Sequence, residues 1–122
     1  MIKGVHTMFY SSDAEATRKF IKEKLGFPHC DVGGGWLIFQ CPEADMGIHP
    51  AEKTAKLGEG APGEHSISFY CDNVEKTVAD LKKKGVEFTH GIEDHGFGLV
   101  TFFKMPGGVN VMLYEPRYEK KF

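Results

Sequence analysis

The sequence predicts one α+β domain in which two tandem βαβββ modules form a half-open mixed β-sheet around a cavity. Two observations support this fold class. A strand-like run, a helix and three further strand-like runs occur in that order twice along the 122 residues. Glu15 and Thr17 in the first predicted helix also recur as Glu75 and Thr77 in the second, an offset of 60 residues. We therefore expect an internal duplication.

The chain is long enough for one domain, which we assign to residues 1–122. Module one is expected to span 1–50 and module two 64–116, with a tail over 117–122. The connecting segment, 51–63, is long for a loop inside a compact domain, and this length favours a lid or a dimer contact.

In module one, apolar residues over 2–10 predict the first strand. Ser12 and Asp13 are expected to open a helix, Ser12 and Glu15 have the S-x-x-E spacing of a helix start, and Gly26 is expected to end that helix. Gly33-Gly34-Gly35 predicts a tight turn between two of the strands that follow. These three strands are expected over 27–32, 36–41 and 46–50.

Module two repeats this order. A strand is expected over 65–71, followed by a helix that Asp72 or Asn73 caps and Gly85 ends. Pro106-Gly107-Gly108 predicts the turn before the last strand. The three strands after the helix are expected over 86–93, 99–105 and 109–115.

Composition narrows the functional class. With 15 Lys and Arg against 17 Asp and Glu and no basic stripe, we expect no nucleic-acid partner. No apolar run approaches the roughly 18 residues of a membrane span, and no signal-peptide pattern begins the chain, so the cytoplasm is the expected location. Three cysteines without C-x-x-C spacing fit a reducing compartment. The basic tail is expected to be solvated or to contact a second subunit.

Strand alternation predicts which side chains face the cavity, because successive side chains point to opposite faces. Val109, Val111 and Leu113 should pack under the helices. Tyrosines on the other face bring hydroxyls that need partners, which favours ligand contact. The side chains expected at the ligand cavity are His6, Met8, Tyr10, Ser66, Ser68, Tyr70, Asn110, Met112 and Tyr114, with Asp45, Gly47 and His49 on the same face in module one.

Four motifs carry a family resemblance: His6-Thr7-Met8, Cys71-Asp72-Asn73-Val74-Glu75, Pro106-Gly107-Gly108 and Leu113-Tyr114-Glu115-Pro116-Arg117. With them the chain resembles the vicinal oxygen chelate superfamily, which includes glyoxalase I, bleomycin-resistance proteins, methylmalonyl-CoA epimerase and extradiol dioxygenases. The resemblance covers nearly the whole chain. It implies a small-molecule ligand in the cavity and a homodimer.

The resemblance also implies a metal site with one ligand on the first and one on the last strand of each module. His6 matches the first position. The other three positions fall on Ser66, Gly47 and Met112, where the superfamily has histidine or carboxylate. We therefore expect binding of a small organic molecule without the full metal site and without a cofactor.

Two alternatives stay open. One-residue register shifts would let His6, His49, His65 and Glu115 hold Zn, Ni, Mn or Fe. The chain would then be a metal-dependent, glyoxalase-like lyase or isomerase, or an extradiol-type dioxygenase. In the other alternative His6 or His49 acts as a general base without metal. Whether the chain is an enzyme is not decided by these patterns.

Overall fold

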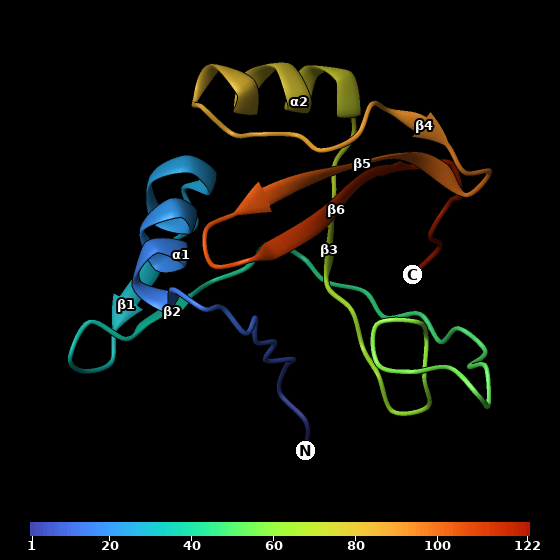
Figure 1. Ribbon diagram of the computed structural model, residues 1–122, viewed down its shortest axis with the longest axis horizontal. Helices are drawn as coiled ribbons and strands as arrows, with labels where there is room; N and C mark the ends of the chain where they lie inside the picture. Colours follow the sequence, from blue (N-terminus) through green and yellow to red (C-terminus); the bar gives the residue numbers. More distant parts are fainter.

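A computed structural model describes residues 1–122 and confirms an α+β fold in which two helices lie near a mixed sheet (Figure 1). Helix α1 spans Ala14–Phe20 and continues as the π-helical turn η1, Ile21–Leu25, and α2 spans Val74–Lys83. The strands are β1 (His29–Asp31), β2 (Leu37–Phe39), β3 (Ser68–Tyr70), β4 (Glu93–Asp94), β5 (Gly98–Met105) and β6 (Val109–Pro116).

The main sheet belongs to the second half of the chain and has the strand order β3-β6-β5-β4. β3 and β6 are parallel, and β5 and β6 form a hairpin paired from Gly98↔Pro116 to Met105↔Val109. The strand expected over 86–93 is wrong in extent: only a bridge from Phe88 to Phe103 and the two-residue β4 form there. Around that bridge, the backbone N–H of Thr89 donates to the carbonyl of Phe102 and that of Lys104 to the carbonyl of Glu87, both at 2.9 Å, so the segment lies along β5 with short pairing only.

The two helices begin in the same way, 60 residues apart. The side chain of Asp13 accepts a hydrogen bond from the backbone of Ala16 (3.1 Å), and that of Asn73 accepts one from Lys76 (3.0 Å). Of the two residues expected to open α1, Ser12 and Asp13, the cap is Asp13. Each cap satisfies a backbone N–H that the helix itself leaves unpaired.

The helix ends also meet. The Lys24 ammonium donates to the carbonyl of Lys84, and the Lys84 ammonium lies 3.5 Å from the carbonyl of Lys24. Gly26 (φ 70°) and Gly85 (φ 84°) follow the two helices in the left-handed region, which favours glycine. Helix ends at an offset of 60 residues thus lie side by side.

The core lies between the helices and one face of the sheet. Phe103 on β5 is 1% exposed, and its ring contacts those of Phe20 on α1, Phe69 on β3 and Phe88. Val74 and Val111, both fully buried, pack in the same cluster. This aromatic contact from α1 across the sheet joins the two halves of the chain.

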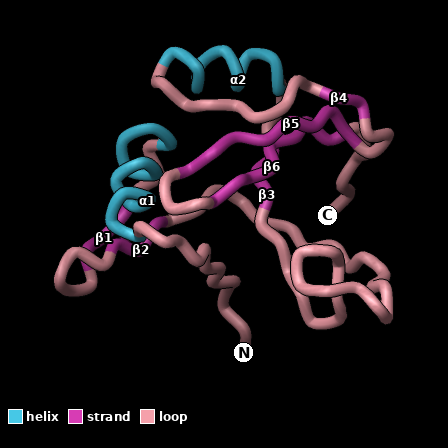
Figure 2. Tube along the Cα trace, in the orientation of Figure 1, coloured by secondary structure: helices cyan, strands magenta, loops and turns pink.

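The first half does not form the expected sheet. Only β1 and β2 pair, around the Gly33–Gly35 turn, while residues 2–10 and 46–50 form no strand, as the loop colouring of Figure 2 shows. Those two strand predictions are wrong for this chain taken alone. An extended segment gains ladder hydrogen bonds only beside another strand, and neither segment has such a neighbour. Their apolar side chains, among them Ile2 and Ile48, are exposed.

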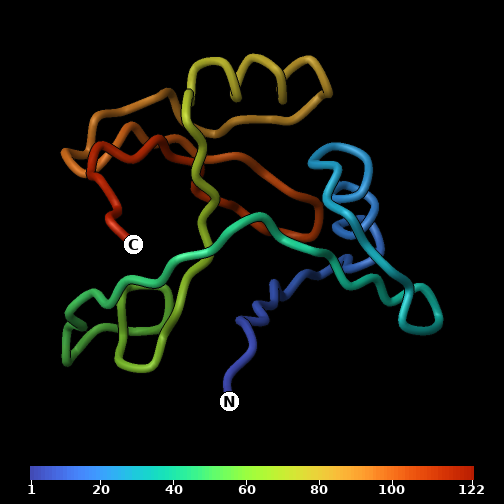
Figure 3. The backbone as a smooth tube through the Cα atoms, turned by 180° about the vertical axis from the view of Figure 1, so that it is seen from behind, coloured from blue at the N-terminus to red at the C-terminus, as the bar shows by residue number.

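The connecting loop, 51–63, extends away from the sheet and helices in both views (Figures 1 and 3). The Glu64 carboxylate accepts hydrogen bonds from the backbone N–H groups of Gly58 and Gly60 and ties the loop to its own end. In this position it is not a lid over the sheet. No helix of the chain is both long and apolar enough to span a bilayer.

Candidate functional site

The face of the sheet opposite the helices carries the candidate site. Strand alternation places Val111 and Leu113 under the helices, at 0% and 4% exposure, as the sequence predicted. The opposite face presents Tyr70 and Tyr114, which are paired across β3 and β6 with ring centroids 6.1 Å apart. Met112 lies on the same face of β6.

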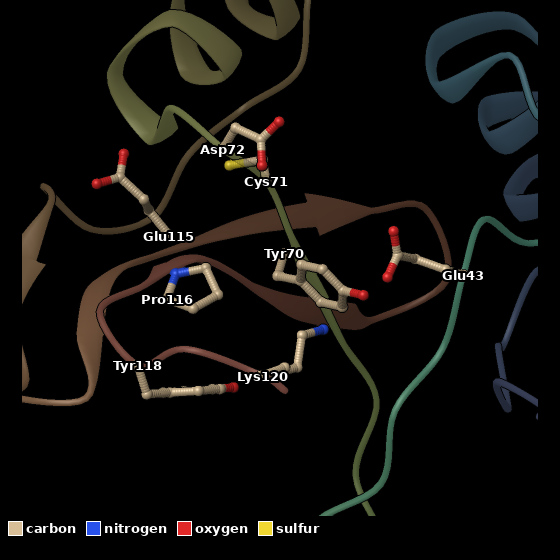
Figure 4. Close-up of a pocket in the computed structure, with 8 residues that line it drawn as sticks. All are labelled: Glu43, Tyr70, Cys71, Asp72, Glu115, Pro116, Tyr118 and Lys120. Carbon is tan, nitrogen blue, oxygen red and sulfur yellow. The ribbon is translucent and has the colours of Figure 1, made fainter. Parts of the chain in front are cut away.

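A hollow of about 300 Å³ opens at the end of these two strands (Figure 4). Its wall comes from the ends of β3 and β6, the residues that lead into α2, the segment after β2, and the C-terminal tail. Tyr70 stands at its centre, with Glu43 on one side and Asp72 and Glu115 toward α2. The hollow is thus built by segments that are far apart in the sequence.

The tail is largely exposed, as expected of a solvated segment, but two of its side chains contact the tyrosine face. The ammonium of Lys120 lies 4.0 Å from the centre of the Tyr70 ring and 2.8 Å from Asp45 Oδ2. The hydroxyls of Tyr118 and Tyr114 are 2.9 Å apart. Sequence reasoning placed Asp45 on the cavity face but missed Lys120 and Tyr118, because the tail has no periodic pattern that predicts where it packs.

The hydroxyl of Tyr70 is buried and has no hydrogen-bond partner. A buried hydroxyl left unpaired costs about 1–3 kcal/mol, so such groups nearly always have a partner in a functioning protein. Because Tyr70 lines the hollow, a ligand there can supply that partner.

The ionisable groups of the site have shifted affinities for protons. The hydrogen bond to Asp45 raises the pKa of the Lys120 ammonium, and the adjacent Tyr70 side chain adds to the rise. Burial raises the pKa of the Tyr114 phenol, and its hydrogen bond with Tyr118 adds to the rise. Burial also raises the pKa of the Cys71 thiol. At neutral pH the site therefore holds a charged lysine, a neutral phenol and a neutral thiol, which is a poor nucleophile.

The remaining side chains expected at the cavity do not line the hollow. Ser68, opposite Met112, and Asn110 do lie on the tyrosine face of β3 and β6, but they are exposed and do not line the hollow, and Asn110 is 3.5 Å from the hydroxyl of Thr89. The others lie outside every strand and are exposed: His6, Met8, Tyr10, His49 and Ser66. Their segments have no paired neighbour, so nothing orients them toward the sheet.

The four residues of the metal alternative do not gather. His6, His49 and His65 are exposed, and the Nδ1 atom of His49 lies 2.8 Å from the carbonyl oxygen of Pro50. Glu115 accepts a hydrogen bond from the backbone of Val74 at 3.0 Å, at the start of α2. No group of three or more His, Cys, Asp or Glu side chains is placed to hold a metal ion. The residues present do not fit the four-position metal site.

The chain was compared with known proteins. A family model described as the glyoxalase/bleomycin resistance protein/dioxygenase superfamily matches residues 3–113. A search of curated proteins finds no match.

Three solved structures illustrate the shared fold. TnmS3, an antibiotic binding protein from Streptomyces sp. CB03234, is 22% identical and aligns over 95% of this chain and 99% of that chain, with a TM-score of 0.60. Lactoylglutathione lyase from Agrobacterium tumefaciens is 17% identical and aligns over 88% of this chain and 89% of that chain, with a TM-score of 0.61. A glyoxalase/bleomycin resistance protein/dioxygenase from Nocardioides is 15% identical and aligns over 91% of this chain and 84% of that chain, with a TM-score of 0.57.

At these identities the likeness is one of fold, while the family model covers nearly the whole sequence. The family resemblance predicted from the four motifs is confirmed. The chain belongs to the glyoxalase/bleomycin resistance protein/dioxygenase superfamily, the vicinal oxygen chelate proteins.

Proposed function

We propose that this protein binds a small organic molecule on the sheet face at Tyr70 and Tyr114, without the four-ligand metal site of its superfamily. The observation that carries the proposal is the buried, unpartnered hydroxyl of Tyr70 inside a hollow of about 300 Å³. A hollow of this size, with aromatic surface and a few polar groups, suits a small ligand.

The donor chemistry supports binding over metal-dependent catalysis. Three of the four metal positions hold Ser66, Gly47 and Met112, none of which is a usual ligand for the superfamily's metals. Glu115, the carboxylate nearest the closing position, is engaged by the backbone of α2. The lyase, isomerase and dioxygenase alternatives therefore have no gathered donor set, and no step through a metal follows for this chain.

Similarity of fold agrees with the proposal. One of the structural neighbours with this fold is described as an antibiotic binding protein. We extend that ligand class, a small organic molecule, to the present chain.

The proposal is tested by screening small organic molecules for a ligand-dependent rise in melting temperature of the full chain. A ligand found in this way should bind about three- to tenfold more weakly to Tyr70→Phe, because the variant lacks the hydroxyl that we expect to pair with it. Tyr10→Phe is the matched control, since Tyr10 is 87% exposed. Binding should be measured by calorimetry.

The same experiment distinguishes the metal alternative. Ligand affinity should be unchanged by chelation, and metal content should stay far below one ion per chain after growth with Zn, Ni, Mn and Fe. Near-stoichiometric metal that is lost in both His65→Ala and Glu115→Ala would contradict the proposal and favour a metalloenzyme.

We further propose a homodimer in which both modules of the chain are completed. The chain exposes 9284 Å², whereas a compact monomer of 13.6 kDa exposes about 6,600 Å². This excess of exposed surface is of the size that the interfaces of stable dimers bury. Exposed apolar residues such as Val5 and Met46 lie in the two unpaired segments, 2–10 and 46–50, that have strand-like patterns.

Sedimentation equilibrium at micromolar concentration should therefore give twice the mass of 13.6 kDa. Removal of the apolar side chains in Ile2→Glu and Val5→Glu together should shift the protein toward monomer, because both lie in the unpaired N-terminal segment. Lys3→Glu, in the same segment, is the control for the change of charge. A single-chain mass for the unmodified protein would contradict the dimer.

A further inference from the structure

We propose that the Tyr70 face is a site for an organic cation, and that Lys120 of the chain's own tail occupies this site when no ligand is bound. The inference rests on the proposed binding function and names the chemical class of the ligand.

The first argument is the position of the Lys120 ammonium. It lies 4.0 Å from the centre of the Tyr70 ring, well inside the range of about 6 Å at which a cation is attracted to the face of an aromatic ring. Asp45 accepts its hydrogen bond at 2.8 Å, and the ring of Phe122 lies 6.0 Å away. The site therefore already solvates one ammonium group through an aromatic face and a carboxylate.

The second argument is the charge of the surrounding wall. Lys120 is the only cationic side chain that lines the hollow, whereas Glu43, Asp72 and Glu115 line it as acids. If Lys120 leaves, these carboxylates and Asp45 remain without a positive neighbour in the wall. The resulting field attracts a cation and repels an anion.

The third argument is that the tail can be displaced. Residues 117–122 form no helix or strand, and the Lys120–Asp45 pair is partly exposed, at 21% and 25% of the two side chains. Exposed ion pairs contribute about 0–1 kcal/mol. Arg117, bonded to Asp94 at 2.8 Å and to the backbone of Phe97, holds the base of the tail in place while its end moves.

The hydroxyl of Tyr70 supplies the advantage that a ligand has over Lys120. The Lys120 ammonium lies over the ring, and the hydroxyl has no hydrogen-bond partner. A protonated amine on an apolar body can place its charge against the ring and Asp45 and direct a second N–H to this oxygen, since an ammonium group carries three donors. The ligand class is therefore a protonated organic amine.

Three probes with one apolar body test the inference: 4-phenylbutylamine as the cation, 4-phenylbutanol as the neutral analogue and 4-phenylbutyrate as the anion. Calorimetry on the full chain at neutral pH should rank the amine tightest and the carboxylate weakest. Lys120→Met removes the competing ammonium and keeps a chain of similar length, so the amine should bind about tenfold more tightly. Lys121→Met is the matched control, because the Lys121 side chain is 81% exposed and pairs only with Glu119, at 4.0 Å.

Two further variants locate the effect. Tyr70→Leu should reduce the preference for the amine over the alcohol, because the aromatic face is lost while the carboxylates remain. Asp45→Asn should weaken the amine in the Lys120→Met background, where the carboxylate has no other cation to bond.

An amine affinity that is unchanged or reduced in Lys120→Met overturns the inference, since Lys120 would then not compete. Alcohol or carboxylate that binds as tightly as the amine, and loses affinity in Tyr70→Phe, also overturns it but leaves the proposed small-molecule function in place. If none of the three probes binds either the unmodified protein or Lys120→Met, the cation site is overturned. The melting-temperature screen with Tyr70→Phe then tests the proposed binding function separately.

Discussion

Replacing Phe103 with alanine should lower the free energy of unfolding by about 3–5 kcal/mol. Phe103 is 1% exposed, and its ring contacts the rings of Phe20, Phe69 and Phe88. Truncation removes the apolar contact that joins α1 to the sheet and leaves a cavity that these rigid rings cannot fill. Urea denaturation followed by circular dichroism measures the loss.

The neighbouring residue provides the control. Phe102 lies one position away on the opposite face of β5, opposite Met112, and is only partly buried. Phe102→Ala should therefore cost about 1–2 kcal/mol. Equal losses in the two variants would mean that the core does not lie on the helix side of the sheet.

Replacing Gly107 with alanine should cost about 3 kcal/mol of stability. Gly107 has φ 88°, and an added Cβ would overlap the Ser11 hydroxyl and lie 2.9 Å from the backbone nitrogen of Asp13. The turn at Gly107 holds the start of α1, because its carbonyl accepts from Ser12 (3.0 Å) and the adjacent Pro106 carbonyl accepts from Thr17 (2.7 Å). The side chain would separate these two segments. Thermal and urea unfolding report the change.

Gly108 makes a strict comparison, because it follows in the same turn with φ 77° and an added Cβ would meet nothing within 4 Å. Gly108→Ala should cost only the strain of a left-handed backbone, about 1–2 kcal/mol. The difference between the variants isolates the contact with α1. Similar costs would show that the turn does not pack against that helix.

Both predictions concern contacts between the two halves of the chain, and the binding site depends on the same junction. The Tyr70 face is built by β3 and β6, while Asp45, which bonds Lys120, comes from the first half. A variant that loosens α1 without unfolding the sheet should therefore also weaken the contact of Lys120 in the tail with Asp45. This link can be read from the amine affinity in Gly107→Ala.

Local patterns determined much of the fold. Alternation along β6 predicted that Val111 and Leu113 are buried and that Tyr114 faces the other side, and the structure agrees because a strand has only two faces. Glycines and cap residues located the helix boundaries, since they reflect constraints on a few neighbouring residues. The family motifs were also readable from the chain alone.

Tertiary structure decided the remainder. The segments 2–10 and 46–50 have strand-like patterns, but a strand needs an edge to pair with, and no pattern within a segment states whether that edge exists. For a related reason the four residues of the metal alternative do not gather in this structure: Glu115 lies beside α2, and the three histidines lie in unpaired segments.

The sequence by itself determined the family and the alternation of side chains in the main sheet. Only the tertiary structure placed Lys120 over Tyr70 and beside Asp45, residues 50 and 75 positions earlier in the chain. Contacts across such separations arise when packed elements bring distant segments together. A short aperiodic tail carries no local signal of where it will lie.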